Sequence, residues 1–137
     1  MTASLQRRRS RIVAMQAKLA HTMIRVRDLD ASIAFYTGFL GLKETRRAHF
    51  GEECTLVFLA DASEQHYIEL TCNHDGRDYE LGDQFGHLAF TVEDLDAVIA
   101  EVEDKGWWYR GNRPESSSRY IFVKDPDGYD IEILQAK

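Results

Sequence analysis

Two histidines and two glutamates occupy equivalent places in an internal repeat of the chain. His21 opens the segment HTMIRVRDLDASIA, and His87 opens the similar segment HLAFTVEDLDAVIA, 66 residues later and without a gap. Glu69 lies in YIEL and Glu132 lies in DIEI, 63 residues apart. An isolated acid in a strand usually faces water. Repeat-related pairs, however, can converge on one cavity, so the pattern predicts a site with two nitrogen and two oxygen donors.

This donor set suits a borderline divalent cation. Imidazole binds nickel, zinc, cobalt or iron, and carboxylates supply hard oxygen ligands. Two carboxylates balance the charge of a divalent ion, so the site can be partly buried. Four ligands would complete a tetrahedral site, whereas an octahedral ion would keep two positions for water or substrate oxygens. The residue types alone leave both geometries open.

The first repeat has the pattern of a strand, a helix and three more strands. Apolar residues alternate over residues 21–26, which predicts a half-buried strand that begins at the histidine. Asp28 or Asp30 can cap the helix that follows, and Gly38 and Gly41 end it. The helix carries an apolar stripe at helical spacing: Leu29, Ile33, Tyr36 and Leu40. The three strands are expected near 42–50, 55–60 and 66–72.

The second repeat has the same order of elements. Its helix ends at Gly106 and carries an apolar stripe: Leu95, Val98, Ile99 and Val102. The strands after it are expected near 107–110, 120–124 and 129–134. The segment DPDG from Asp125 predicts a type I turn between the last two strands. Each repeat is therefore βαβββ, and the fold class is α+β.

Six motifs, in this order and spacing, resemble those of glyoxalase I (lactoylglutathione lyase), a family of the vicinal-oxygen-chelate superfamily. The resemblance covers residues 20–135. The motifs are HTMIRV from His21, FYTGFLG from Phe35, IELTCN from Ile68, YELG from Tyr79, FGHLA from Phe85 and DPDGYDIE from Asp125. The resemblance implies a vicinal-oxygen-chelate fold, in which two tandem βαβββ modules form curved mixed sheets that enclose a metal site.

The same resemblance divides the chain. Residues 19–137 would form a single glyoxalase-like domain, made of module 1 (about 19–73), a linker (about 74–84) and module 2 (about 85–135). Residues 1–18 are basic and free of acids, which is typical of a flexible leader or of an assigned start upstream of Met15. Their role is left open by the sequence.

By this resemblance, the metal ligands are His21, Glu69, His87 and Glu132. Family members are commonly homodimers in which one chain supplies the first-half ligands and the other chain the second-half ligands, although the sequence leaves open whether one chain or two supply them here. Histidine at the first ligand position of a short chain is similar to the bacterial-type members that work best with nickel or cobalt. Ni²⁺ is therefore the first expectation, and Zn²⁺ or Co²⁺ are the alternatives.

The resemblance also implies a reaction. Glutathione and methylglyoxal form a hemithioacetal, and the family isomerises it to S-D-lactoylglutathione by proton transfer through a metal-bound enediolate. Glu132 matches the family's usual base, and Glu69 is the opposed carboxylate. Arg25 and Asn73 match positions that bind glutathione. One departure is the loop at 111–119, which is short and lacks lysine, so that Arg113 or Arg119 would replace the family's basic loop or another thiol would be used.

Three other activities on this scaffold fit the sequence less well. An epimerase of acyl-CoA substrates would need a basic groove, which this acidic chain does not offer. An iron dioxygenase would use two histidines and one carboxylate, so the fourth ligand, Glu69, argues against it. A metal-free binding protein would not need the histidines and glutamates at all. The resemblance therefore implies a carbon–sulfur lyase that acts in methylglyoxal detoxification.

Composition agrees with one compact domain. The 137 residues are 44% apolar and 29% charged, with no run of about 18–20 apolar residues that could cross a membrane. After residue 20, 12 basic side chains stand against 23 acidic ones, which argues against nucleic-acid binding. Cys54 and Cys72 lack the spacing of a disulfide framework or a zinc finger, so a cytoplasmic location is expected.

Overall fold

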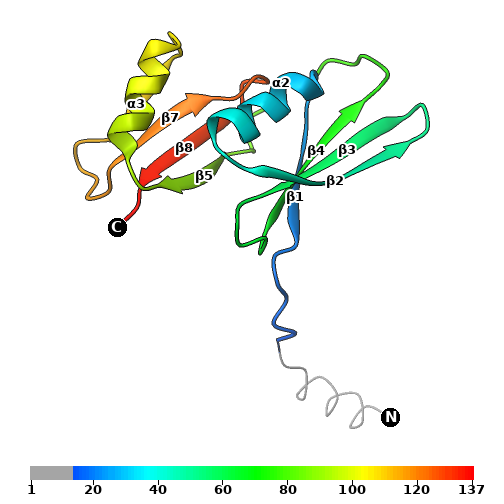
Figure 1. The fold of residues 1–137 in the computed structure, drawn as a ribbon, viewed down its shortest axis with the longest axis horizontal. Helices are drawn as coiled ribbons and strands as arrows, with labels where there is room; N and C mark the ends of the chain where they lie inside the picture. Colours follow the sequence, from blue (N-terminus) through cyan, green and yellow to red (C-terminus); the bar gives the residue numbers. More distant parts are fainter. Residues whose placement is uncertain (1–13) are drawn as a thin grey trace.

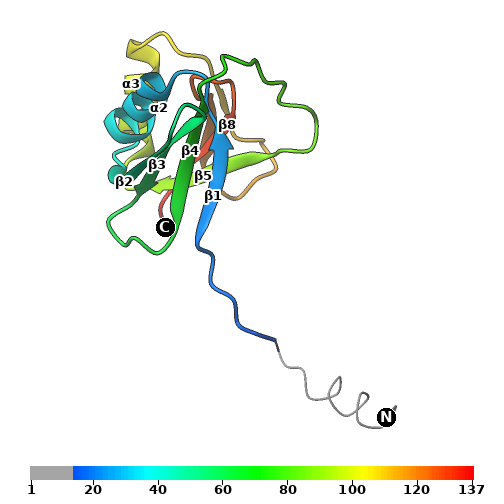
Figure 2. The ribbon, with the colours of Figure 1, turned by 90° about the vertical axis from the view of Figure 1, so that its right-hand side faces the viewer.

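The protein folds into two four-stranded sheets, one from each repeat. The structure is a computed structural model that describes residues 14–137, so most of the predicted leader lies outside the described residues. The sheets lie side by side, and the helices pack together on one side of them (Figures 1 and 2). None of the helices in the described range is long and apolar enough to span a bilayer.

Module 1 has the predicted order of elements. Its strands are β1 (His21–Arg25), β2 (Lys43–Phe50), β3 (Cys54–Ala60) and β4 (Tyr67–Asn73), and its helical segment is α2 (Leu29–Ile33) followed by η1 (Ala34–Phe39). The spatial order is β1-β4-β3-β2. β1 and β4 are parallel, whereas the other neighbours are antiparallel.

Module 2 repeats this arrangement. Its elements are β5 (His87–Val92), α3 (Leu95–Asp104), β6 (Tyr109–Gly111), β7 (Tyr120–Lys124) and β8 (Asp130–Gln135). The spatial order is β5-β8-β7-β6, again with a parallel first pair and antiparallel neighbours after it. The predicted α+β fold of two βαβββ modules is confirmed.

The helical segment of module 1 differs in detail from the prediction. Asp28 caps it, because its carboxylate accepts a hydrogen bond from the amide of Ala31 at 3.1 Å. The segment widens into a π-helix at η1, so Gly38 lies inside it and the prediction that Gly38 ends the helix is wrong. The chain turns at Gly41, whose φ of +77° suits glycine.

β6 begins two residues later than expected. The predicted strand starts at Trp107, but the indole of Trp107 packs against the rings of Phe35 and Phe39, with centroids 5.7 and 5.0 Å away. The helix of module 1 thus holds this residue out of the sheet, and the strand starts at Tyr109. A local pattern could not predict this, since the contact joins residues about 70 positions apart.

One apolar core joins the two modules. Strand residues such as Leu70 and Ile131 share a buried cluster with helix residues such as Tyr36 and Leu95, and all four are 0% exposed. Because side chains alternate along a strand, the residues next to these core positions point to the opposite face of each sheet. Glu69 and Glu132 occupy such positions.

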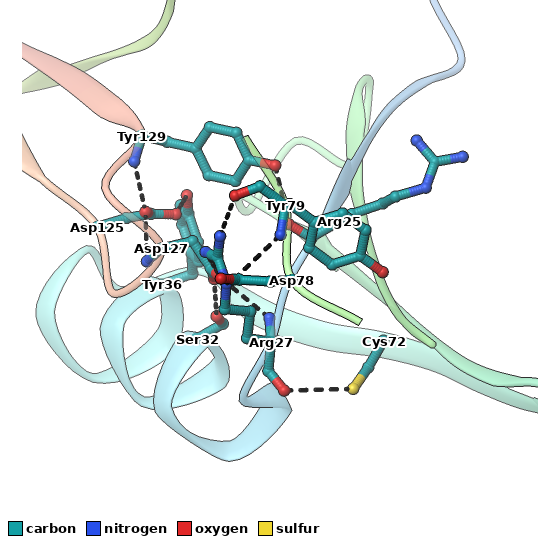
Figure 3. Close-up of polar contacts among 10 residues, drawn as sticks. All are labelled: Arg25, Arg27, Ser32, Tyr36, Cys72, Asp78, Tyr79, Asp125, Asp127 and Tyr129. Atoms are coloured by element: carbon teal, nitrogen blue, oxygen red, sulfur yellow. Dashed lines mark hydrogen bonds and ion pairs between the residues drawn. The ribbon is translucent and has the colours of Figure 1, made fainter. Parts of the chain in front are cut away.

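A polar network also links the modules, at the turn between β7 and β8 (Figure 3). The carboxylate of Asp127 accepts hydrogen bonds from the backbone amide of Arg27 at 2.9 Å and from the hydroxyl of Ser32 at 3.3 Å. The Arg27 guanidinium contacts the same carboxylate and also Asp78 in the linker. This network attaches the linker and the module 2 turn to the end of β1.

Candidate metal centre

The first histidine–glutamate pair lies on the parallel strands β1 and β4. His21 Nε2 is 3.3 Å from Glu69 Oε1. The His21 side chain is 46% exposed and the Glu69 side chain only 12%. The other carboxylate oxygen of Glu69, Oε2, accepts a hydrogen bond from the hydroxyl of Thr71 at 2.8 Å. The pair therefore has an anchored carboxylate and an imidazole that reaches toward solvent.

The second pair lies on the equivalent strands β5 and β8. His87 Nε2 is 3.4 Å from Glu132 Oε1, and the two side chains are 41% and 17% exposed. The position equivalent to Thr71 is Leu134, which has no hydroxyl to donate. The two pairs thus have the same residue types and nearly the same separation, but their carboxylates differ in hydrogen bonding.

The two separations fit metal ligands better than hydrogen bonds. A charge-assisted N–H···O⁻ bond has a length of about 2.7–2.9 Å. Two donor atoms bound to one ion at about 2.1 Å lie about 3.0 Å apart in an octahedron and about 3.4 Å apart in a tetrahedron. The observed 3.3 and 3.4 Å lie in this second range. The separation within each pair is therefore compatible with two ligands of one ion.

The four predicted ligands do not meet within one chain. Among residues 14–137, no group of three or more His, Cys, Asp or Glu side chains is placed to hold a metal ion. The structure brings His21 to Glu69 and His87 to Glu132, but it keeps the two pairs apart. Each module thus presents one histidine–glutamate pair.

A phenyl ring lies against each of these histidines. The ring of Phe58 meets His21 edge-on, with centroids 5.6 Å apart and an interplanar angle of 90°. The ring of Phe122 meets His87 in the same way, at 4.9 Å and 87°. Each phenylalanine lies directly across from its glutamate in the antiparallel pairing, Phe58 from Glu69 and Phe122 from Glu132. The rings limit how each imidazole can turn.

An arginine covers each phenyl ring in turn. The guanidinium carbon of Arg46 lies 4.3 Å from the centroid of Phe58, and that of Arg110 lies 4.6 Å from the centroid of Phe122. The sequence interpretation missed all four residues. The signal was present, since an arginine precedes a phenylalanine by 12 positions in both repeats.

The two predicted glutathione-binding residues have different surroundings. Arg25 is exposed, and its guanidinium extends away from the polar network (Figure 3). Its backbone carbonyl accepts a hydrogen bond from the hydroxyl of Tyr129 at 2.9 Å, which fixes the end of β1. The side-chain amide of Asn73 donates to the hydroxyl of Tyr79 at 2.6 Å, so a ligand would have to share or replace that contact.

The 111–119 loop offers fewer free cations than the sequence suggests. Arg119 forms an ion pair with Asp96 on α3. Arg113 is exposed, and its backbone amide donates to the hydroxyl of Tyr120 at 3.3 Å. Of the two arginines considered as substitutes for a basic loop, one is therefore already neutralised.

The remaining histidines and cysteines play no part in the two pairs. His66 contacts the hydroxyl of Thr22 at 3.1 Å. The other two share one hydroxyl, that of Thr55: His49 at 3.1 Å and His74 at 2.8 Å. Burial raises the pKa of the Cys72 thiol, as expected for an unreactive cysteine.

Similarity to known proteins places the chain in a family. Residues 18–133 match the Glyoxalase/Bleomycin resistance protein/Dioxygenase superfamily. The chain belongs to this family. The family resemblance and the fold expected from the sequence are both confirmed.

Several similar proteins are lactoylglutathione lyases or glyoxalase I enzymes. A probable lactoylglutathione lyase of Synechocystis sp. is 42% identical over 123 residues, which are 85% of this chain and 94% of that protein. A lactoylglutathione lyase of Neisseria meningitidis is 37% identical over 126 residues, 88% of this chain and 91% of that protein. Among solved structures, the trypanothione-dependent glyoxalase I of Leishmania major is 37% identical, with a TM-score of 0.75 over 88% of this chain and 87% of that one.

Proposed function

We propose that this protein is a lactoylglutathione lyase, which isomerises the hemithioacetal of methylglyoxal and glutathione to S-D-lactoylglutathione. The observation that carries the proposal is the pair of equivalent histidine–glutamate sets, each spaced at 3.3–3.4 Å as two ligands of one ion. It agrees with the similarity to lactoylglutathione lyases that are 36–42% identical over most of the chain.

The donor set fits a divalent metal ion. His21 and Glu69 would hold it from one side, and His87 and Glu132 from the other. An ion held there would supply Lewis acidity toward the two adjacent oxygens of the adduct. Two imidazoles and two carboxylates suit Ni²⁺ first, with Zn²⁺ and Co²⁺ as alternatives.

The proton transfer is assigned to the two glutamates. Glu132 removes the proton from the carbon that carries sulfur and returns it to the neighbouring carbon, so the product is an isomer and no electron acceptor is needed. The hydroxyl of Thr71 occupies one oxygen of Glu69, whereas Leu134 offers no such donor to Glu132. Glu132 therefore lacks the hydroxyl contact that occupies an oxygen of Glu69. This supports Glu132 as the base and Glu69 as the opposed carboxylate.

The complete site is assigned to a homodimer, in which module 1 of one chain faces module 2 of the other. The separation of the two pairs within one chain supports this, because each pair alone offers only two ligands. The exposure of His21 and His87, 46% and 41%, leaves both imidazoles accessible to a second copy. Residues 19–137 would act as one domain, and the two free cysteines agree with a cytoplasmic location.

A second thiol is the main alternative. The Leishmania major relative is described as trypanothione-dependent, so the same fold accepts a thiol other than glutathione. Arg25 and Asn73 would bind the peptide part of either thiol. An epimerase of acyl-CoA substrates remains the second alternative on this scaffold, and it would form no thioester from methylglyoxal and glutathione.

The proposal is tested with apoprotein loaded with Ni²⁺ or Zn²⁺ in turn. Methylglyoxal and glutathione are equilibrated, the enzyme is added, and ultraviolet absorbance follows the thioester. We expect thioester formation with at least one ion, and D-lactate after hydrolysis. Absence of turnover with both ions, in protein that has bound the ion, would overturn the proposal. Turnover with trypanothione alone would instead assign the other thiol.

A further inference from the structure

We infer that Phe58 and Phe122 are positioning residues, which hold the imidazoles of His21 and His87 in the orientation that binds the metal ion. The inference rests on the proposed function, because it takes both histidines as metal ligands. It assigns to two buried phenyl rings a task that hydrogen bonds usually perform in metalloproteins. Three observations support it: the hydrogen bonding of the imidazoles, the room around His21, and the same contact in both repeats.

The usual anchor of a metal-binding histidine is absent from both imidazoles within residues 14–137. Such a histidine normally donates its second ring N–H to a carboxylate or a carbonyl, and this bond fixes the orientation of the ring. His21 contacts Glu69 and His87 contacts Glu132, in both cases through Nε2. Neither Nδ1 has a hydrogen-bond partner among the described residues. The orientation of each imidazole therefore depends on other contacts.

A phenyl ring supplies such a contact in both modules. The Phe58 ring meets the His21 imidazole at 90°, with centroids 5.6 Å apart. The Phe122 ring meets the His87 imidazole at 87° and 4.9 Å. Edge-to-face pairs with centroids about 4.5–7 Å apart are a favoured arrangement of aromatic rings. Each phenyl ring therefore favours one orientation of its imidazole.

The phenyl rings are themselves fixed, unlike the imidazoles that they contact. Phe58 is 8% exposed and Phe122 is 9% exposed, whereas the two histidine side chains are 46% and 41% exposed. The guanidinium groups of Arg46 and Arg110 cover the rings, 4.3 and 4.6 Å from the ring centroids. A buried and covered ring offers a rigid surface to an exposed neighbour.

His21 would otherwise have room to turn away from the ion. It lines a cleft of about 420 Å³ together with Phe58 and Arg46. An exposed side chain beside such a space has several rotamers, and selecting one of them costs conformational entropy when the metal binds. A ring that limits these rotamers in advance reduces that cost and so tightens metal binding.

The repeat supports the inference independently. In the antiparallel ladders, Phe58 lies directly across from Glu69, and Phe122 lies directly across from Glu132. Directly paired residues share one face of a sheet, so each phenyl ring stands beside the carboxylate that accompanies its histidine. The arrangement of ring, imidazole and carboxylate thus occurs twice, although the hydroxyl of Thr71 occurs beside only one of the carboxylates. The phenyl ring is therefore part of the repeated unit.

The first test measures the motion of each imidazole in the apoprotein. NMR relaxation of isotope-labelled histidine side chains compares Phe58→Leu and Phe122→Leu with wild type. We expect Phe58→Leu to lower the order parameter of the His21 ring and to leave that of His87 unchanged. Phe122→Leu should do the reverse. Each histidine thus serves as the internal control for the other.

The second test measures metal affinity by competition with a chelator. The Kd for Ni²⁺ should be about twofold to tenfold higher in each leucine variant than in wild type, the loss expected for one aromatic pair. Phe35→Leu is the matched control, because Phe35 is 5% exposed and packs on Phe39 and Trp107 rather than on a histidine. It should lower the free energy of unfolding in urea but keep the wild-type Kd.

Two results would overturn the inference. In the first, the leucine variants keep the order parameter of the adjacent imidazole or the wild-type Kd. In the second, the Kd rises equally in Phe35→Leu, which would mean that any loss of core packing weakens the metal site. The two variants act in separate modules, so one that fails to fold leaves the other as a test. Failure of the proposed function is a different result, in which the wild-type enzyme with bound ion forms no thioester.

Discussion

The two glutamates differ at the level of single atoms although their strands are equivalent. The hydroxyl of Thr71 donates to Glu69 at 2.8 Å, and the leucine at 134 cannot do the same for Glu132. Equivalent positions of the duplicated fold thus give one glutamate a hydroxyl partner and the other an apolar neighbour.

We predict that Glu132→Gln separates catalysis from metal binding. The amide oxygen can still face the ion but cannot accept the proton, so kcat should fall by about 10²–10⁴-fold. Metal content after Ni²⁺ loading, measured by mass spectrometry, should stay near the wild-type value. His87→Ala is the comparison, and it should lose both metal and activity. A smaller loss of kcat in Glu132→Gln than in Glu69→Gln would reverse the roles of the two glutamates.

Tyr36 and Asp125 form a buried polar contact between the modules. The Tyr36 hydroxyl donates to the Asp125 carboxylate at 2.7 Å, and the residues are 0% and 5% exposed. Burial raises the pKa of Asp125 above its usual value. The native state therefore holds the Asp125 proton more tightly than the unfolded state does.

This raised pKa has a definite consequence for stability. As the pH rises through the window between the usual carboxyl pKa and the raised native pKa, the Asp125 contribution to the free energy of unfolding falls. Asp125→Asn removes that contribution, so its stability relative to wild type should increase with pH across the window. Urea unfolding from about pH 4 to about pH 8 measures this. A relative stability that is constant with pH would contradict it.

Asp61→Asn serves as a control of opposite sign. The hydroxyl of Ser63 lowers the pKa of the exposed Asp61 carboxyl. Its stabilising contribution is present above the usual carboxyl pKa and is lost as the pH falls through the lowered native value. The difference between this variant and wild type should therefore shrink on acidification.

At the scale of elements, strand alternation placed the histidines and glutamates on the face away from the core, and the repeat singled out His21 and His87 among five histidines. Their role as metal ligands stays a prediction. The stacked arginines were not predicted, because cross-strand neighbours depend on register, which neither repeat reveals alone. The π-helix at η1 and the late start of β6 also escaped prediction, since each depends on packing between the modules.

The carboxylate of Asp127 is expected to stabilise the contact between the β7–β8 turn and module 1. Asp127, whose side chain is 4% exposed, and Asp78, at 88%, both contact the guanidinium of Arg27. Asp127→Ala leaves the hydroxyl of the buried Ser32 and the backbone amide of Arg27 without this acceptor and should lower the free energy of unfolding by about 1–3 kcal/mol. Asp78→Ala, which removes an exposed partner of the same arginine, should cost less than about 1 kcal/mol. Urea unfolding compares the two, and equal losses would contradict the assignment.

At the scale of the whole molecule, the separated pairs make a prediction about subunits. His21→Ala and His87→Ala should each be inactive alone. When the two are unfolded together and refolded, each mixed dimer would contain one site with all four ligands. Random reassociation should then restore about a quarter of the wild-type activity.

The control for this experiment is a mixture of His21→Ala and Glu69→Ala. Both changes lie in module 1, so neither site of a mixed dimer would be complete and no activity should return. Recovery in neither mixture would indicate that one chain supplies all four ligands. The comparison requires only activity and metal content of the refolded mixtures.

The proposed division of the ligands between two chains would also couple metal uptake to protein concentration. A lone chain would offer an ion two donors, whereas an assembled pair would offer four. By thermodynamic reciprocity, the ion must then tighten the association of the subunits by the same factor by which association tightens its own binding. Dilution should therefore release the ion, and chelation should promote dissociation. Freshly made chains would stay metal-poor until they find a partner.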